Sequence, residues 1–146
     1  MRPRIWLAAL IVTVLAQPAF ANDAECQYIE IATTNGKTGA IDPDLKALEK
    51  KLRKPPFTAW NTFKKLSSGT VALTKLKAET LKLKQGSASV LLRDRTEKRL
   101  ELTVTVDNAA GKRVLEAKQA SKAGDWVLFV DTNAKDDGHI LALTCK

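Results

Sequence analysis

The hydrophobic residues between positions 41 and 54 recur with helical spacing. The apolar positions are Ile41, Leu45, Leu48 and Leu52. Their separations of four, three and four residues place them on one face of a helix. Asp42 is a favourable N-cap residue, Pro43 suits the first helical position, and Pro55-Pro56 stops a helix. The sequence therefore predicts one capped helix near the N-terminus of the folded domain.

Large apolar residues then follow at intervals of three. They are Phe57, Trp60, Phe63 and Leu66. This spacing predicts a short helical or 3₁₀-rich segment with an aromatic edge, closed by Ser67-Ser68-Gly69. Two interpretations of the aromatic edge stay open at this point. Its side chains either fill the core beneath a loop or form an exposed surface that anchors a partner.

From Thr70 onward the hydrophobic period changes to two. The clearest strand is Arg99–Val106, in which Leu, Leu, Val and Val alternate with polar residues. Polar turns separate further short strands, including His139–Cys145, and another strand is expected at Cys26–Thr33. Trp126–Val130 is apolar on both faces, so we expect it to be a covered central strand.

These patterns predict the fold class. We expect an α+β domain that is mainly β, an antiparallel β-sandwich or open barrel of seven to eight strands. One capped N-terminal helix and the short aromatic helical segment complete it. No Ser-, Gly- or Pro-rich linker divides the sequence, so residues 22–146 are expected to form one domain.

The first 21 residues are typical of a secretory signal peptide. Arg2 and Arg4 precede an apolar run at 5–16, and Ala19-Phe20-Ala21 supplies small residues at a cleavage site. The run is too short to cross a bilayer, which takes about 20 residues. We therefore expect a periplasmic or secreted protein that begins at Asn22 after cleavage and does not span a membrane.

Two cysteines, Cys26 and Cys145, lie near the two ends of the mature domain. In an oxidising compartment they can form one intramolecular disulfide. Neither belongs to a C-x-x-C motif or adjoins a histidine, so a structural role is expected rather than a redox or metal-binding one. The bridge requires the first and last strands to approach each other.

Charge is distributed unevenly along the chain. The full sequence carries +8, and loss of Arg2 and Arg4 with the leader leaves +6. Residues 37–84 hold twelve basic and four acidic side chains, whereas residues 85–146 are nearly balanced. This third of the protein forms either an ordinary solvated surface or an electropositive one that attracts anionic partners.

Recognisable catalytic and metal motifs are not found in the sequence. His139 is the one histidine, and it follows a glycine turn, so we expect it at the start of a strand and partly exposed. An enzyme would need a site assembled around it, with Asp125, Asp131 or Asp136 as partners. The run from Asp131 to Gly138 departs from a calcium loop at several positions and is interpreted as a polar hairpin loop. No cofactor or metal is expected.

The functional prediction is a non-enzymatic binding module with a basic surface. Its predicted binding residues are Lys50, Lys51, Arg53, Lys54, Phe57, Trp60, Phe63, Lys64 and Lys65. The expected partners are an anionic envelope polymer, lipid head groups or an acidic protein. Nucleic acid is not expected, because no nucleic-acid-binding motif is present. The alternatives are a structural or assembly subunit of the cell envelope and, less favoured, an enzyme with a site around His139.

Overall fold

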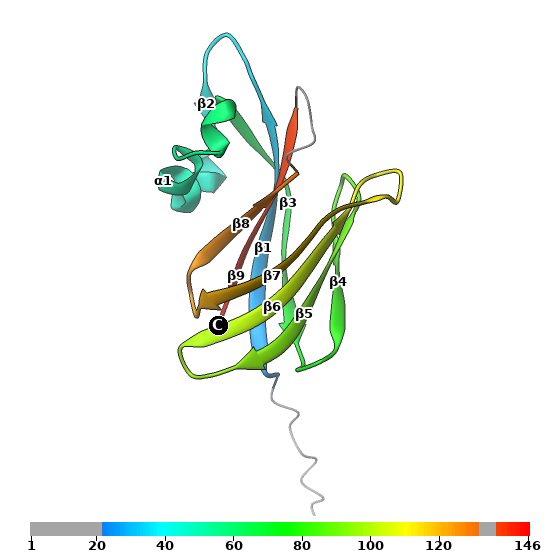
Figure 1. Cartoon of the computed structure of the whole chain (residues 1–146). Helices are drawn as coiled ribbons and strands as arrows, with labels where there is room; N and C mark the ends of the chain where they lie inside the picture. Colours follow the sequence, from blue (N-terminus) through cyan, green and yellow to red (C-terminus); the bar gives the residue numbers. More distant parts are fainter. Residues whose placement is uncertain (1–21, 132–136) are drawn as a thin grey trace, which may run out of the picture.

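Two β-sheets dominate the computed structural model, which describes residues 22–131 and 137–146 (Figure 1). The predicted leader and residues 132–136 of the polar hairpin loop lie outside this part. The five-stranded sheet has the order β2-β3-β1-β9-β8, and the four-stranded sheet has the order β4-β5-β6-β7. All neighbours are antiparallel except β2 and β3, which are parallel. The mainly β, α+β class is therefore confirmed.

The strands follow one another along the chain with a helical segment inserted early. The five-stranded sheet contains β1 (Ala24–Thr34), β2 (Ala40–Ile41), β3 (Thr62–Leu73), β8 (Trp126–Val130) and β9 (Gly138–Cys145). The four-stranded sheet contains β4 (Ala78–Lys82), β5 (Ser87–Arg95), β6 (Arg99–Asp107) and β7 (Arg113–Lys122). It curls across one face of the other sheet, which gives the sandwich the look of a half-open barrel (Figure 1).

The main core lies between the two sheets. Alternate residues of β6 face it, and all four apolar positions predicted from the period of two are buried: Leu100, Leu102, Val104 and Val106. The five-stranded sheet contributes Leu73, Phe129, Leu141 and Leu143 to the same core. Their burial supplies the hydrophobic stabilisation of the sandwich.

A second core lies on the opposite face of the five-stranded sheet. Ile140 and Ala142 alternate along β9 with Leu141 and Leu143, so they point away from the main core. They are covered by Leu45, Leu48 and Leu52 of the helical segment. The predicted apolar face of that segment is therefore confirmed, and β9 is apolar on both sides because both of its faces are covered.

The helical segment differs from a single α-helix. It runs as 3₁₀ turns over η1 (Pro43–Leu48), one α-helical turn α1 (Glu49–Leu52) and a short 3₁₀ turn η2 (Phe57–Ala59). The predicted cap is present, since Asp42 Oδ1 accepts a hydrogen bond from the Asp44 backbone N–H at 3.0 Å. The bond from Leu45 N to Asp42 O, at 2.9 Å, spans three residues and is the 3₁₀ pattern.

The prediction that the aromatic helical segment extends to Leu66 is wrong. Strand β3 begins at Thr62 and pairs along its whole length with β1, so Phe63 and Leu66 are strand residues. Gly69, predicted to close the segment, lies in mid-strand opposite Tyr28. A Cβ atom there would come within 2.7 Å of the Tyr28 hydroxyl, so the aromatic ring occupies the space that a side chain would need. The pairing of β3 with β1 therefore outweighed the helical preference that the spacing of three residues had indicated.

Strand β8 is covered but not central. Val127 and Phe129 face the main core, while Trp126, Leu128 and Val130 pack against the second core. The prediction of coverage on both faces is therefore confirmed. Its predicted central position is wrong, because β8 is the outer strand of its sheet and the centre is taken by β1 and β9.

The predicted disulfide joins the first and last strands. Cys26 and Cys145 are direct partners in the β1–β9 register, with their Cα atoms 4.1 Å apart, and both are buried. The bond fixes the ends of the domain to one another. In the described part of the chain, no helix is long and apolar enough to cross a membrane.

Candidate functional site

A groove of about 750 Å³ opens where the helical segment, strand β8 and the base of the β6–β7 hairpin meet. We call it the basic groove. Its cationic lining consists of Lys51, Lys54, Lys98, Arg99 and Lys122, and its acidic lining residue is Asp125. Its apolar lining includes Phe57, Trp126 and Leu128. A volume of this size is typical of sites that hold a small ligand or part of a larger one.

Local hydrogen bonds position the cationic side chains from three separate parts of the chain. Arg99 and Lys122 are direct partners in the β6–β7 register, and the Ala123 N–H donates to Lys98 O at 3.0 Å. The chain then turns sharply through Gly124, which has φ +89°, into β8. This turn is tied to the last strand, because the Gly124 N–H donates to Cys145 O at 2.7 Å.

The helical segment supplies the other wall. After α1, the Phe57 N–H donates to Lys54 O at 3.0 Å, which reverses the chain around Pro55 and Pro56. Phe57 then packs against the second core, so its ring is held between that core and the groove. Lys51 and Lys54 therefore stand on a segment that is anchored by apolar contacts.

The five cations of the groove are exposed and lack ion-pair partners among the residues that the structure describes. Some surface cations elsewhere are paired. Lys65 Nζ lies 2.9 Å from Asp44 Oδ2, and this hydrogen bond with its charge raises the pKa of Lys65. Unpaired cations around a concavity generate a positive potential that is focused into it. The groove is therefore suited to an anionic group.

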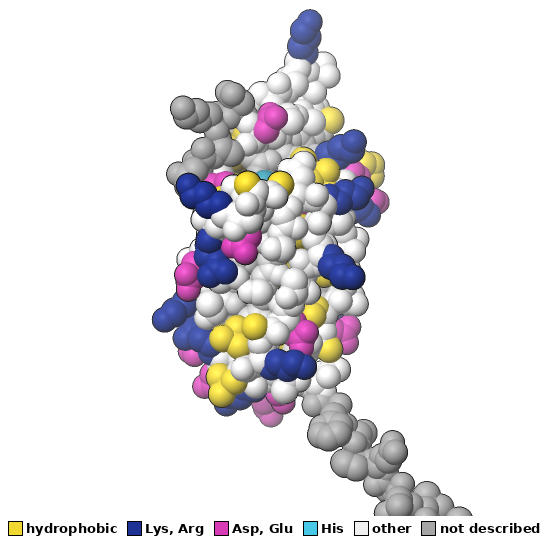
Figure 2. Space-filling view, turned by 90° about the vertical axis from the view of Figure 1, so that its right-hand side faces the viewer, with side chains coloured by type: hydrophobic (Ala, Val, Ile, Leu, Met, Phe, Trp, Pro, Cys, Tyr) yellow, Lys and Arg dark blue, Asp and Glu magenta, His cyan; other side chains and the backbone are white. Residues whose placement is uncertain are grey.

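The opposite side of the molecule has a different distribution of charge. On the face shown in Figure 2, Lys and Arg side chains are interspersed with Asp and Glu. Ion pairs outside the groove include Lys75 with Asp94 and Arg113 with Asp107. What distinguishes the groove is that five cations and a single acidic side chain, Asp125, line one concavity.

The floor of the groove is partly apolar. Trp126 and Leu128 are half-buried, and both pack against the second core, as Phe57 does. An apolar portion of a ligand that rests on these side chains would be removed from water, while an acidic portion would meet the cations at the rim. The geometry suits a ligand that carries both.

The structure divides the predicted binding residues between two hollows. Lys51, Lys54 and Phe57 line the basic groove. Arg53, Trp60 and Phe63 line a second hollow of about 650 Å³, in which the Arg53 guanidinium is paired with Glu49 at 2.6 Å. The predicted cluster is therefore split by the helical segment.

The remaining predicted residues lie elsewhere on the surface. Lys50 is exposed on α1, Lys64 is exposed on β3, and Lys65 is paired with Asp44. The aromatic residues are largely packing residues. Phe63 is 4% exposed, and a Cβ atom at Gly138 would come within 2.4 Å of the Trp60 ring, so that ring lies directly against β9.

The groove residues that were not predicted as binding residues include Lys98, Arg99, Lys122 and Trp126. A weak signal existed for two of them. Lys98-Arg99 is a pair of cations at the start of the clearest predicted strand. No local spacing indicates that they would face the helical segment, because that juxtaposition depends on how the two sheets are joined.

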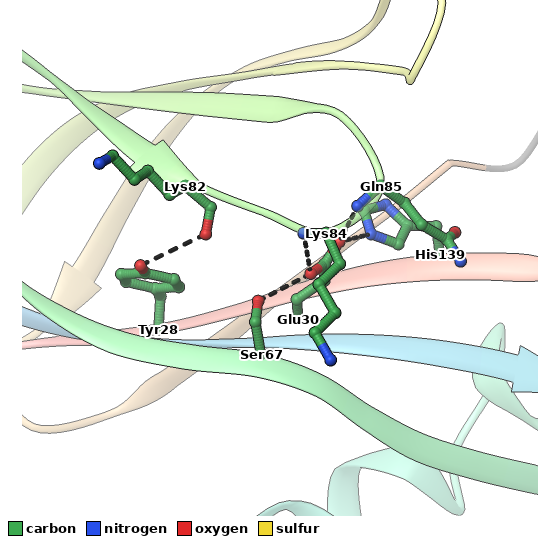
Figure 3. A network of polar contacts seen from close by, with 7 residues as sticks. All are labelled: Tyr28, Glu30, Ser67, Lys82, Lys84, Gln85 and His139. Carbon is green, nitrogen blue, oxygen red and sulfur yellow. Dashed lines mark hydrogen bonds and ion pairs between the residues drawn. The ribbon is translucent and has the colours of Figure 1, made fainter.

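A second feature that sequence reasoning missed is the buried carboxylate of Glu30 (Figure 3). Its exposed fraction is 0%, and it lies between β1 and the β4–β5 turn. Oε1 accepts hydrogen bonds from Ser67 Oγ and from the Lys84 backbone N–H, both at 2.7 Å. Oε2 accepts from the Gln85 backbone N–H at 2.9 Å and lies 2.7 Å from His139 Nε2.

The surroundings of Glu30 keep it ionised. Burial by itself raises the pKa of this carboxyl, because a low-dielectric environment disfavours the charged form. The four hydrogen bonds, led by the one from Lys84 N–H, outweigh burial, and the net pKa is lowered. The network links β1, β3 and β9 to the turn between β4 and β5, so it joins the two sheets.

His139 has a carboxylate partner in Glu30, which is not among the three aspartates that the enzyme alternative would need. The hollow beside His139, which Asp131 also lines, holds only about 10 Å³, roughly the space of one water molecule. Asp125 lies in the basic groove, and Asp136 is outside the described residues. Among the residues described, no cluster of three or more His, Cys, Asp or Glu side chains could hold a metal ion.

Compared with protein-family models, curated protein sequences and solved structures, the chain matches none of them.

Proposed function

We propose that this protein is an exported, non-enzymatic binding module that holds an anionic ligand in the basic groove. The observation that carries the proposal is the set of five exposed cations without ion-pair partners in the described chain, arranged around a groove of about 750 Å³. The leader-like N-terminus and the Cys26–Cys145 bridge support export, since disulfides persist in oxidising compartments.

Physical considerations favour binding over a purely structural role for this surface. Lys51 and Lys54 line the same groove as Lys98, Arg99 and Lys122 of other elements, and like charges around one concavity repel one another in the absence of a counter-charge. An anionic ligand relieves this repulsion. Long-range attraction would also accelerate encounter and would be screened by salt over about 8–10 Å.

The test compares two charge-reversed variants of the mature, oxidised protein. The groove variant carries Lys51→Glu, Lys54→Glu, Lys98→Glu and Lys122→Glu. The control carries Lys37→Glu, Lys46→Glu, Lys64→Glu and Lys112→Glu, which are exposed positions outside the groove with the same total change of charge. Both are titrated with polyglutamate, an anionic polysaccharide and phosphatidylglycerol vesicles at low and high salt.

We expect at least one of these probes to bind wild-type protein in a salt-sensitive manner. The groove variant should lose at least about tenfold in affinity, which corresponds to about 1.4 kcal/mol, while the control stays within about threefold. Equal losses in both variants would show that net charge, not the groove, governs binding. Salt-insensitive self-association through apolar strand edges would instead favour the structural or assembly subunit.

A further inference from the structure

Strand β8 forms one wall of the basic groove and has an open hydrogen-bonding edge. Among the strands that the structure describes, it pairs with β9 alone, in a register that sets Trp126 opposite Thr144 and Val130 opposite Ile140. The Asp131 N–H donates to His139 O at 3.3 Å, which makes these two residues a hydrogen-bonded pair. Because such pairs alternate along an antiparallel ladder, Phe129 and Val127 also bond toward β9.

The intervening residues of β8 bond in the other direction. The backbone N–H and C=O groups of Trp126, Leu128 and Val130 point away from β9. The hydrogen bonds between β9 and β1 agree with these bonding directions. The Lys146 N–H donates to Glu25 O at 2.9 Å, so even-numbered residues of β9 bond toward β1 and odd-numbered ones toward β8. Two of the outward-facing residues, Trp126 and Leu128, line the groove.

The neighbouring edge of β7 is less available. There the Ala123 bond to Lys98 directs the backbone of Ala120 and Lys122 outward. Both outward carbonyls are already engaged, since Ala120 O accepts from Gln119 Nε2 at 3.0 Å and Lys122 O accepts from the Asp125 N–H at 3.1 Å. Of the two strand edges at the groove, β8 is therefore the one that can accept a new strand.

We propose that the basic groove takes an extended acidic segment of a partner protein, which adds as a further strand beside β8. This inference rests on the proposed function and names the ligand class. The backbone of the added strand would pair with Trp126 and Leu128, and its carboxylates would meet the five cations of the groove. Apolar side chains between the carboxylates would rest on Phe57 and Trp126.

Charge complementarity selects this occupant over a second copy of the chain. A β8–β8 pairing between two copies would bring two sets of five groove cations together. Free polyanions and lipid head groups satisfy the cations but not the outward backbone groups of β8. An acidic peptide satisfies both.

The experiment uses wild-type mature protein, with its disulfide intact, and a nine-residue peptide of alternating Glu and Val. Hydrogen exchange of the backbone amides is followed by NMR with and without saturating peptide. We expect exchange at Trp126 and Leu128 to slow by at least about tenfold, because their amides become donors to the added strand. The Lys37 amide, in the loop before β2, should be unaffected. Unchanged exchange at Trp126 and Leu128 would overturn the proposal.

Modified peptides separate strand addition from simple charge attraction. A peptide that is N-methylated along one edge keeps its other edge free and should bind within about threefold of the parent. A peptide N-methylated along both edges has the same charge and should bind at least about tenfold more weakly. Equal binding of all three peptides would overturn strand addition while leaving the groove as an anion-binding site.

Two further outcomes are decisive. If an anionic polysaccharide or anionic vesicles bind through the groove cations but the alternating peptide does not, strand addition is wrong and the proposed function stands. If the peptide-free protein forms a dimer in which the Trp126 and Leu128 amides are protected, the occupant of the edge is a second copy and the proposal is overturned.

Discussion

The Glu30 carboxylate and the His139 imidazole lie 2.7 Å apart, although 109 residues separate them in sequence. His139 belongs to β9, and Glu30 belongs to β1, its neighbour in the five-stranded sheet. The same carboxylate accepts two backbone N–H groups from the β4–β5 turn of the other sheet. It thus satisfies donors that would otherwise be unpaired at the junction of the two sheets.

Replacing Glu30 by Gln should destabilise the protein. The amide group presents one acceptor oxygen and an NH₂ group where the carboxylate presented two oxygens, so at least one of the Lys84 and Gln85 N–H groups would face a donor. We expect a loss of about 3 kcal/mol in the free energy of unfolding. Urea denaturation at pH 7 measures it. Glu25→Gln, an exposed position on the same strand, is the control and should change stability by less than about 0.5 kcal/mol.

The contribution of Glu30 should also depend on pH. Its pKa in the folded protein is below the ordinary value of 4.5, so the folded state binds fewer protons than the unfolded state in that range. The stabilisation is fully present above the unfolded value and is lost as the pH falls through the lower, folded pKa. The stability difference between wild type and Glu30→Gln should therefore shrink in acid. A difference that stays constant from pH 7 down to pH 2 would contradict the hydrogen-bonded, ionised state.

The disulfide should contribute strongly to stability. Cys26 and Cys145 close a loop with a sequence separation of 119 residues, and cross-linking so long a loop restricts the unfolded chain. We expect the Cys26→Ala, Cys145→Ala double variant to lose about 2–4 kcal/mol, with a lower melting temperature than the oxidised protein. Differential scanning calorimetry measures the change. Equal melting temperatures for both proteins would show that the bridge adds nothing to strand pairing.

Gly69 and Tyr28 should behave as a coupled pair. A methyl group at position 69 would come within 2.7–2.9 Å of three atoms of the Tyr28 side chain, so Gly69→Ala must displace the ring or the strand. We expect a cost of about 1–3 kcal/mol in wild type. In a Tyr28→Ala background the same substitution should cost much less, because the clashing ring is gone. Additive effects in this double-mutant cycle would contradict the close approach.

Local sequence patterns anticipated the parts of the fold that local patterns control. Alternation predicted the buried face of β6, and the spacing of Leu45, Leu48 and Leu52 predicted the apolar face of the helical segment. The two cysteines predicted that the first and last strands approach each other, and β1 and β9 are neighbours. In each case the prediction depended on residues that are close together in the sequence or are joined by the disulfide.

The failures involve long-range pairing. Phe63 lies three residues after Trp60, which is a helical spacing, yet it belongs to β3 and pairs with β1. Trp126–Val130 is apolar on both faces because two cores cover it, although it lies at a sheet edge. The hydrophobic pattern of a strand indicates which of its faces are buried. It does not indicate which strands lie beside it in the sheet.

The candidate site was only partly predictable for the same reason. Lys51, Lys54 and Phe57 belong to the predicted basic and aromatic segment, whereas Lys98 and Lys122 reach the groove only through the fold of the β6–β7 hairpin. Glu30 carried an unused signal. Glu30 lies four residues after Cys26 in β1, so the two side chains point to the same face of the strand. If Cys26 is buried in a disulfide, Glu30 is expected to be buried as well.

NMR chemical-shift mapping can show whether the basic groove is the binding site for an anionic ligand. Isotope-labelled mature protein is titrated with polyglutamate at low salt. We expect the largest changes to cluster at Lys98, Arg99, Lys122 and the Trp126 indole, and we expect high salt to suppress them. Changes spread evenly over all surface lysines, or centred on Lys64 and Lys75 instead, would contradict this expectation.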